Sequence, residues 1–555
     1  MATHRSVFTQ RTRRRRGPSL LAAAAVLATA ACGSTVQSSG GGLAGGAAGS
    51  GVAGDGLGGT GAGGVDGLGA AGSAAAGTTG TGVDAGAGTA FGGGSTGTAG
   101  SVGGSSGGSG SASGGGAEPG GTVGAPRSSA TQGPGVTAKE IFIGVRITEN
   151  LQEARAAFGA ANVDSGDYKA NVKAMFDEIN ARGGVAGRTL KPIYHTDDAQ
   201  SAETGDSKDA AACETFNVDN KVAATISGGG EVFAACMKKA GVLQVNAGGI
   251  ICCDNVFFQQ NPGVVLLGAV SQDRMMADMV RALQRQAYFS GWDFTLGQPA
   301  LTKAKIGILG WDFPEWVRPQ ERVMLPALAR LGHPVDKDLV IRIQGTQGNQ
   351  DAGRFAAEVS SAVLRFKGAG VTHLILLDGD GLITLTYTKN AQNQNYFPRL
   401  GINSATAVQA LYSAGIYDAK PFTGATGVGW KPGLDLPFGQ GDRYLGSPTK
   451  ECLEIIRKRT GQTFNDTNSA SVALAVCDTM FGLAEAYNRA GPVLNISTAV
   501  RGLESIKGSF RAASVPKVFL GPGRHDGLEL GFDMFWDLAC KCIKYRDKGH
   551  SMPPA

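Results

Sequence analysis

The sequence predicts an α/β protein in which mostly parallel sheets carry helices on their faces. Three observations support this class. Residues 139–198 have the pattern of a strand, a helix and a second strand, and the same alternation continues along the chain. The 420 residues from Val136 to Ala555 are also enough for two lobes of ordinary domain size.

The first unit begins with the apolar run Ile141–Val145, which is typical of a strand covered on both faces. Apolar residues within Val172–Ile179 recur at helical spacing and predict a helix that starts near Asp167. Gly183 and Gly184 end this helix, because glycine takes a left-handed cap without strain, and a strand resumes at Thr189. The unit is therefore βαβ.

Apolar runs farther along the chain predict more strands, and helical stretches separate them. We expect Glu231–Ala240 to be a helix and another helix to begin near Met275. The expected strands cover residues 222–226, 242–245, 264–267, 306–309, 339–343 and 374–377. Such alternation favours parallel sheets, because two parallel strands need a crossover connection between them.

The opening unit resembles that of the type I periplasmic binding proteins. The resemblance rests on the run EINARGGVAGR (Glu178–Arg188), on an apolar strand ending in Gly-Val and on a second strand that runs into Asp197-Asp198. The branch it resembles most is that of the branched-chain amino-acid, amide and urea receptors of ABC transporters. It extends from about Thr137 to Tyr545.

The resemblance implies a two-lobed fold, each lobe a mostly parallel sheet flanked by helices, with a hinged cleft between the lobes. The chain would cross between the lobes three times. Lobe one would comprise residues 136–269 and 433–514, lobe two residues 270–432 and 515–545, and residues 546–555 a C-terminal tail. These crossings come from the resemblance, because periodicity does not locate them.

Residues 1–31 predict an export signal of the lipoprotein type. Six arginines precede an apolar segment too short to span a membrane comfortably, and small residues precede Cys32. We expect Cys32 to carry lipid. An ordinary secretory signal cleaved nearby is the alternative, since Thr29 stands where a lipobox prefers leucine. The Arg13-Arg14 pair leaves open whether export follows the general secretory or the twin-arginine route.

The composition changes abruptly after Cys32. Of the 103 residues from Gly33 to Gly135, 41 are glycine. Such a segment buries too little apolar surface to offset the entropy of ordering it, so we expect residues 32–135 to be a disordered tether. A Gly-rich coil of about 100 residues spans on the order of 55 Å, which suits a domain held outside a membrane.

The net charge excludes one class of partner. The signal holds six arginines and no acidic residue, so the rest of the chain has 45 basic and 46 acidic residues. A near-neutral chain offers no electrostatic footprint for a polyanion. We therefore expect no nucleic-acid partner.

Nine cysteines in an exported chain predict disulfides, and eight remain once Cys32 is set aside. We expect Cys213 to pair with Cys236, and Cys452 with Cys477, because helices packed on one face of a sheet can bring such positions within bridging distance. A zinc site is the competing interpretation of the other four, but neither close pair has the two-residue gap of a zinc knuckle. These four, left open as two local bridges or as pairs across, are Cys252, Cys253, Cys540 and Cys542.

No enzyme motif is present. The sequence contains no GxSxG, no HExxH and no phosphate-binding loop ending in Gly-Lys-Ser/Thr, and its six histidines form no ligand-like pair. Asp378 and Asp380 follow an expected strand, where ligands of open α/β sheets bind. Asp378 is more simply a turn residue, whereas Asp380 is kept as a candidate ligand residue. We expect no catalytic residue, metal or cofactor.

Loops at two expected strand ends predict a ligand site in lobe one. One lies between a strand and a helix, where backbone N–H groups attract an anion and glycine lets a ligand approach. In the resembled family this turn and the next strand end hold the carboxylate end of the ligand, and an aromatic residue closes over it. The matching residues here are Phe158, Ser227, Gly229, Gly230, Glu231, Ala247, Gly248 and Gly249.

Aromatic residues supply the expected wall from lobe two. Trp311, Phe313 and Trp316 follow an expected strand, and Trp430 lies near a crossing. Clustered aromatics are usually core, but these positions favour a cleft wall. The hydroxyls with which amino-acid receptors of the family hold a zwitterion are missing here. We therefore expect leucine, isoleucine and valine to bind weakly, and a larger, flatter or less polar ligand, such as one with a single carboxylate, to bind better.

Together these observations predict a monomeric solute receptor, lipid-anchored on the extracytoplasmic face of the cell membrane. It would close on a small organic ligand and present it to an ABC permease. A sensory receptor of the same fold is one alternative, and an exported enzyme that uses the cleft is another.

Overall fold

The computed structural model describes residues 131–157, 165–226, 228–247, 253–345, 351–379, 381–416 and 419–554. The expected signal, Cys32 and the tether up to residue 130 lie outside these ranges. Residues 131–135, the end of the expected tether, lie against the folded chain, because the Gly133 N–H donates to the Leu494 carbonyl (2.7 Å). Other predicted positions outside the described residues are Phe158, Ser227, Gly248, Gly249, Cys252 and Asp380.

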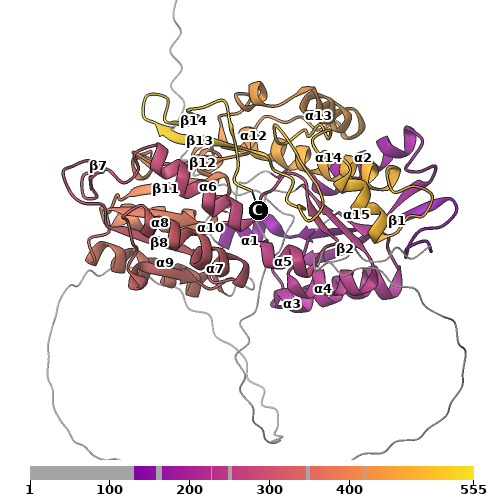
Figure 1. Ribbon diagram of the computed structural model, residues 1–555, viewed down its shortest axis with the longest axis horizontal. Coiled ribbons are helices and arrows are strands. Elements are labelled where there is room, and N and C mark those ends of the chain that lie inside the picture. The colour runs from indigo at the N-terminus through magenta and orange to yellow at the C-terminus, as the bar shows by residue number, and fades with distance from the viewer. Residues whose placement is uncertain are drawn as a thin grey trace, which may run out of the picture. The chain divides into compact units, whose positions relative to one another are not determined.

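The first sheet has five parallel strands in the order β2-β1-β3-β4-β5 (Figure 1). The strand bounds are β1 Glu140–Glu149, β2 Thr189–Asp198, β3 Ala224–Thr225, β4 Leu243–Asn246 and β5 Val264–Leu266. Alternate residues of β1 face opposite sides: Ile141 and Ile143 join the main core, whereas Phe142 packs with Phe216 and Phe233. Helices therefore cover both faces of this sheet.

Two groups of helices flank the first sheet. One group consists of α2, α13, α14 and α15, which pack on one another, and the other consists of α3, the π-helical turn η1 and α4. The N-cap of α2 is Asp167, as predicted, and its side chain accepts from the Ala170 N–H. The bounds are α1 Leu151–Ala157, α2 Tyr168–Ala181, α3 Gly205–Cys213, η1 Glu214–Asp219, α4 Glu231–Ala240, α5 Asn255–Gln260, α13 Ser447–Thr460, α14 Thr467–Asn488 and α15 Ile496–Glu504.

The second sheet follows the order β14-β13-β12-β11-β10-β8-β9, and β15 pairs with β13. Strands β8 to β12 are parallel, while β13, β14 and β15 are antiparallel to their partners. The bounds are β8 Ile306–Trp311, β9 Val340–Ile343, β10 His373–Leu377, β11 Arg399–Asn403, β12 Thr426–Gly429, β13 Leu530–Asp537, β14 Cys542–Tyr545 and β15 His550–Ser551. A separate hairpin consists of β6 Trp292–Asp293 and β7 Gln298–Pro299.

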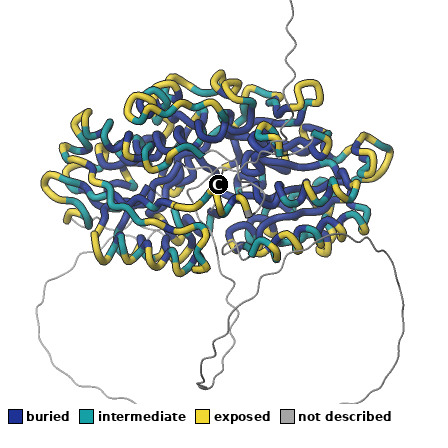
Figure 2. The backbone as a smooth tube through the Cα atoms, turned by 180° about the vertical axis from the view of Figure 1, so that it is seen from behind, coloured by how far each residue is buried: buried dark blue, intermediate teal, exposed yellow. Residues whose placement is uncertain are grey.

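Helices also flank the second sheet: α6 packs with α7, η2 and α8, and α9 packs with α10. The α-helices are α6 Gln272–Arg285, α7 Pro314–Pro319, α8 Leu325–Arg330, α9 Ala352–Gly368, α10 Leu382–Asn393, α11 Val408–Ser413 and α12 Pro432–Asp435. The other turns are η2 Gln320–Met324, η3 Lys337–Leu339, η5 Ser404–Thr406, η6 Lys420–Phe422 and η7 Gly441–Tyr444. In Figure 2 the strands and inner helix faces are buried and the outer loops are exposed. The predicted α/β class, with mostly parallel sheets flanked by helices, is confirmed.

The chain passes between the two sheets in three intervals: 266–272, 429–447 and 504–530. Buried carboxylates hold each passage. Asp526 accepts from the Ser271 N–H, Asp435 from the Ser404 and Tyr545 hydroxyls, and Asp478 from the N–H groups of residues 513 and 514. The residue at which each lobe ends stays a prediction from the resemblance.

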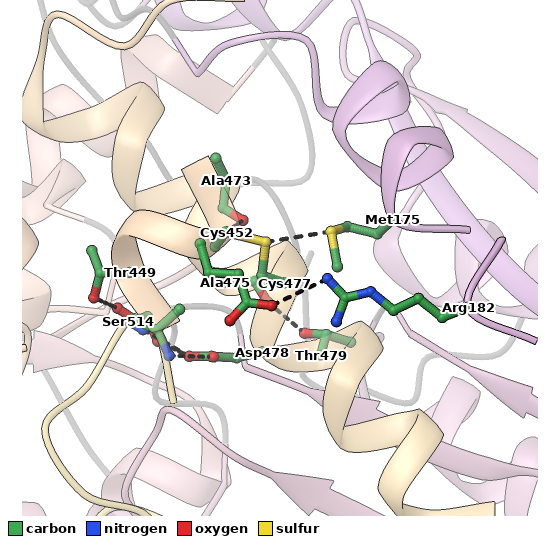
Figure 3. The surroundings of a disulfide bond; sticks show 12 residues. Met175, Arg182, Thr449, Cys452, Ala473, Ala475, Cys477, Asp478, Thr479 and Ser514 are labelled. Atoms are coloured by element: carbon green, nitrogen blue, oxygen red, sulfur yellow. Dashed lines mark hydrogen bonds and ion pairs between the residues drawn. A yellow bond between two sulfur atoms is a disulfide. The ribbon is translucent and has the colours of Figure 1, made fainter. Parts of the chain in front are cut away.

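One helix within the described ranges, α14, is long and apolar enough to cross a membrane. Of its apolar window, 72% is buried inside the protein, where it packs on α2 and α13. Figure 3 shows Cys477 of α14 bonded to Cys452 of α13, with the Met175 sulfur of α2 3.4 Å away. Helix α14 is accordingly a core helix of the first lobe.

Both predicted disulfides are confirmed: Cys213–Cys236 joins α3 to α4, and Cys452–Cys477 joins α13 to α14. Of the four cysteines left open, Cys540 and Cys542 form a local bridge. Cys253 is also in a disulfide, whose partner is not among the described residues.

Strand β2 is the outermost strand of the first sheet. Its outer edge is partly closed by its own neighbours, because the Asn180 side chain accepts from the Leu190 N–H (2.8 Å) and donates to the Leu190 carbonyl (3.0 Å). Two residues farther along stands Pro192, which has no N–H to offer.

Candidate functional site

A buried ion cluster lies at the carboxyl end of β1. The Arg146 guanidinium bonds both oxygens of Asp197 on β2, and its Nη1 donates to Asp209 Oδ1 on α3 (2.6 Å). It also lies 5.6 Å from the centre of the Phe233 ring. Burial opposes ionisation, but hydrogen bonds from His195 and Arg146 hold the pKa of Asp197 below its usual range.

The second oxygen of Asp209 caps helix α4. Asp209 Oδ2 accepts from the Gly230 N–H (2.7 Å), and more weakly from the Phe233 N–H (3.4 Å). A methyl group at Gly229 would come within 2.9 Å of Arg146 Nη1, so glycine permits this close approach. The helix terminus that we expect to attract a ligand anion therefore already binds a carboxylate of the chain itself through two of its N–H groups.

The backbone donor at the next strand end is also engaged. The Ala247 N–H donates to Thr479 Oγ1 on α14 (2.8 Å). A ligand carboxylate would have to displace this hydroxyl as well as Asp209. The Gly230 and Ala247 N–H groups of the expected lobe-one anion site are therefore engaged within the chain, and Gly229, Gly230 and Ala247 lie at the strand ends where the sequence predicts them.

Aromatic residues cluster where β8 and β10 of the second sheet end. The Trp311 ring stacks on Phe313 (5.6 Å between centroids, 11° between planes) and on Phe355 of α9 (5.7 Å). The Trp316 ring lies against Gly379, because a Cβ there would come within 2.9 Å of it. Trp311, Phe313 and Trp316 are at most 6% exposed, so they form a packed wall with little surface open to water.

Glu315 stands inside this aromatic segment, and sequence reasoning missed it. It is 3% exposed, and its Oε2 has no hydrogen-bond partner within the part of the chain that the structure describes. The pKa of Glu315 is raised to about 7, chiefly by burial and also by the charges of Glu231 and Asp254, while a hydrogen bond from its own backbone N–H and the charge of Arg318 oppose the rise. Glu315 therefore lies beside acidic groups from the first lobe.

An ion pair joins the two lobes next to Glu315. Arg318 of α7 binds Asp254 with two bonds (Nε to Oδ2 2.7 Å, Nη2 to Oδ1 2.9 Å). Asp254 is fully buried and also caps α5 by accepting from the Phe257 N–H. Arg322 adds a third contact to Asp254 at 3.2 Å. The starts of α4, α5 and α7 thus meet where strands of both sheets end.

Solved structures share this architecture. A type 1 periplasmic binding protein from Bordetella pertussis Tohama I has a TM-score of 0.52 at 16% identity, covering 74% of this chain and 100% of that chain. A solute-binding protein from R. palustris in complex with 4-hydroxybenzoate has a TM-score of 0.53 at 13% identity, covering 75% and 98%. A possible leucine/isoleucine/valine-binding protein from Rhodopirellula baltica SH 1 has a TM-score of 0.50 at 14% identity, covering 74% and 97%.

The chain has the type I periplasmic binding protein fold. No protein-family model matches the chain, and no curated protein matches it. The predicted two-lobed fold class is confirmed by the solved structures, whose identity to this chain is too low to carry a ligand across.

Two other predicted residues sit elsewhere in this type I fold. Trp430 is fully buried at the passage between the sheets, where its backbone N–H donates to the Ser404 hydroxyl (2.8 Å). Asp378 is fully buried, and its Oδ2 accepts from the N–H and hydroxyl of Thr384 at the start of α10. The turn interpretation of Asp378 is therefore confirmed.

One acidic cluster in the described ranges has the spacing of a metal site: Asp533, Asp547 and His550. A guanidinium already compensates its charge, because Arg285 Nη2 donates to Asp533 Oδ1 (2.6 Å). Burial lowers the pKa of His550, but hydrogen bonds to Asp278 and Asp547 raise it overall. We interpret the cluster as an ion-pair network that ties β15 to α6 and β13.

Proposed function

We propose that this protein is an exported solute receptor that binds a small organic ligand between its lobes and delivers it to an ABC permease. The observation that carries the proposal is the meeting of α4, α5 and α7 beside an aromatic wall, at the strand ends of both sheets. Ligands of α/β sheets bind outside the carboxyl ends of their strands. The type I periplasmic binding protein fold supports the same role.

The proposed ligand contacts come from both lobes. Trp311, Phe313 and Trp316 would supply flat apolar surface, and Glu231 and Glu315 would supply polar contacts. Gly230 and Ala247 would shape the lobe-one side through their bonds within the chain, and Gly229 through the close approach it allows to Arg146. Further predicted contacts are Phe158, Ser227, Gly248, Gly249, Asp380 and Trp430.

Mass spectrometry under native conditions tests the proposal. We expect the full chain, purified from its own host, to carry one small molecule per protein. A Trp316→Ala variant should lose that molecule, whereas Phe438→Ala, a change at an exposed aromatic residue (49%), should retain it. Folded wild-type protein that carries nothing, and that shows no heat of binding with amino acids, amides or organic acids, would contradict the proposal.

We also propose that lipid on Cys32 holds the receptor at the membrane as a monomer. Each buried CH₂ contributes roughly 0.8 kcal/mol, so several acyl chains give durable binding. A Cys32→Ser variant should be released into the medium or remain unprocessed. Unchanged membrane association of this variant would refute lipid anchoring without touching the solute-binding proposal.

Two alternatives use the same ligand site. A sensory receptor of the same fold would bind the ligand without a permease, so capture of a permease by the anchored full chain separates sensing from transport. An exported enzyme would convert its ligand, so recovery of the bound molecule unchanged after incubation excludes that alternative.

A further inference from the structure

Among the described carboxylates around Glu315, some form ion pairs with arginine and others do not. Asp254 is bound by Arg318 and Arg322, and Arg322 also reaches Asp273 at 3.3 Å. Glu231, at the exposed start of α4, forms no ion pair within the described residues. Glu315 is buried, and its Oε2 has no hydrogen-bond partner among the described residues. Glu231 and Glu315 are therefore two carboxyl groups with no ion pair in this part of the chain, and the Arg318 charge that acts on them is already bound to Asp254.

The arginine side chains in this region already bind carboxylates of the chain. Arg318 points its Nε and Nη2 at Asp254, and Arg146 is shared by Asp197 and Asp209. At the N-terminus of α4, Asp209 accepts from the Gly230 and Phe233 N–H groups, and Thr479 accepts from the Ala247 N–H. A ligand carboxylate at the start of α4 would therefore meet the Asp209 carboxylate and the negative charges of Glu231 and Glu315.

We infer that the ligand of the proposed cleft presents a cation, a protonated or quaternary amine, to the Glu315 carboxylate and places no carboxylate at the start of α4. The adjacent Trp316 ring suits such a ligand, because the face of an indole attracts a cation. The inference rests on the proposed function. It narrows the ligand class expected from the sequence, which included organic acids.

Charge-matched probes test this inference on the full chain by calorimetry. The probes are phenethylamine, phenyltrimethylammonium and 3-phenylpropanoate, which present a similar ring with opposite charges. We expect both cations to bind at least tenfold more tightly than the acid at pH 8. Glu315→Gln should reduce cation affinity at least tenfold, and Glu231→Gln should reduce it less.

The matched control is Glu321→Gln, on the same segment, where the carboxylate is half exposed and paired with Arg342 (2.6 Å). Its affinities should equal those of the wild type. Circular dichroism establishes that each variant is folded, and Glu231→Gln keeps the test decisive if Glu315→Gln is not.

The dependence of affinity on pH adds a second readout. The groups that act on Glu315 are Glu231, Asp254 and Arg318, with Arg322 and Asp273 behind them. A cation favours the ionised carboxyl group, so phenyltrimethylammonium affinity should rise about tenfold from pH 6 to pH 8, following the ionised fraction of a group that titrates near 7. An acid that used protonated Glu315 would show the opposite slope.

The outcomes separate the two claims. Tight, saturable binding of 3-phenylpropanoate with no loss in Glu315→Gln would overturn the cation inference and leave the solute receptor standing. Binding of neither kind of probe by folded wild-type protein would count against both. Cation binding that is unchanged in Glu315→Gln would overturn the role of Glu315.

Discussion

The strand-end regions of the two lobes differ in whether their buried charged groups have partners. At the end of β1 in lobe one, Arg146 binds Asp197 and Asp209, and Asp209 also caps α4, so each of these buried charges has a partner. After β8 in lobe two, Glu315 is equally buried, but its Oε2 has no hydrogen-bond partner among the described residues. The buried charges of the first region are satisfied, whereas the unsatisfied oxygen of the second costs stability. Such a cost is typical of a functional site.

The largest expected effect comes from removing Arg146 from the ion cluster of lobe one. Arg146→Met would leave Asp197 and Asp209 buried without their shared cation, and should lower the free energy of unfolding by about 3–5 kcal/mol. Urea unfolding of the full chain measures this. Lys173→Ala, which removes an exposed pair with Asp177, is the control and should cost about 0.5 kcal/mol or less. A loss no larger than that of the control would mean that the cluster is not a stabilising unit.

The next effect concerns the bridge that keeps Asp209 in place. Cys213–Cys236 links α3, which carries Asp209, to α4, which Asp209 caps. Replacing both cysteines with serine should lower the free energy of unfolding by about 3 kcal/mol, because the bridge restricts the unfolded chain by joining residues 23 positions apart. Differential scanning calorimetry reports it as a lower Tm. An unchanged Tm would show that packing alone positions the helices.

A smaller effect concerns the titration of Glu315 in lobe two. The pKa of Glu315 is raised to about 7, chiefly by burial, so the folded chain holds this proton more tightly than the unfolded chain does. The stabilisation is present below pH 4.5 and is lost as the pH rises through 7. Between pH 6 and pH 8 the wild type should lose about 1 kcal/mol more than Glu315→Gln, measured by urea unfolding at both pH values.

The measurement starts at pH 6 because two other buried carboxyl groups titrate near that pH. Burial raises the pKa values of Asp435 and Asp478 to about 6, so most of their contribution is lost below the range in which Glu315 titrates. A slope equal in the wild type and in Glu315→Gln would contradict the assignment to Glu315.

The smallest effect tests the hydrogen bond from the Ala247 N–H to Thr479 in lobe one. Thr479→Val removes the hydroxyl that accepts from the Ala247 N–H and should cost about 1 kcal/mol. Thr479→Ser keeps the hydroxyl and should recover most of the loss in the same unfolding measurement. A valine variant as stable as the wild type would show that the bond from the Ala247 N–H contributes nothing, and the loss in the serine variant measures the methyl group, which valine keeps.

Much of the fold could be predicted because its signals are local. The helix Glu231–Ala240 was expected with the bounds the structure has, since an amphipathic run follows glycines and ends at Gly241. The strand expected at 222–226 shortens to Ala224–Thr225. Strand length depends on the neighbours with which a strand pairs, and no single segment encodes its neighbours.

The site was less predictable because its contacts are distant in sequence. Asp209 meets the start of α4 because α3 packs on α4, and the glycine loop alone does not reveal this contact between separate helices, so the sequence predicts an open anion site there. Glu315 was missed because the cleft-wall prediction rests on the aromatic residues around it, from Trp311 to Trp316, and gives no role to the acidic residue among them. An acidic residue inside an aromatic strand-end run is the signal that could have identified it.

The outer edge of β2 bears on how crowded copies of this chain behave. Unpaired strand edges recruit strands from other molecules and seed aggregates. Here Asn180 occupies the hydrogen-bonding groups of Leu190, and Pro192 interrupts the row of donors that an incoming strand would need. Crowded copies of the chain should therefore not pair through the edge of the first sheet. Replacing Pro192 would restore a donor at this edge and favour such pairing without disturbing the fold.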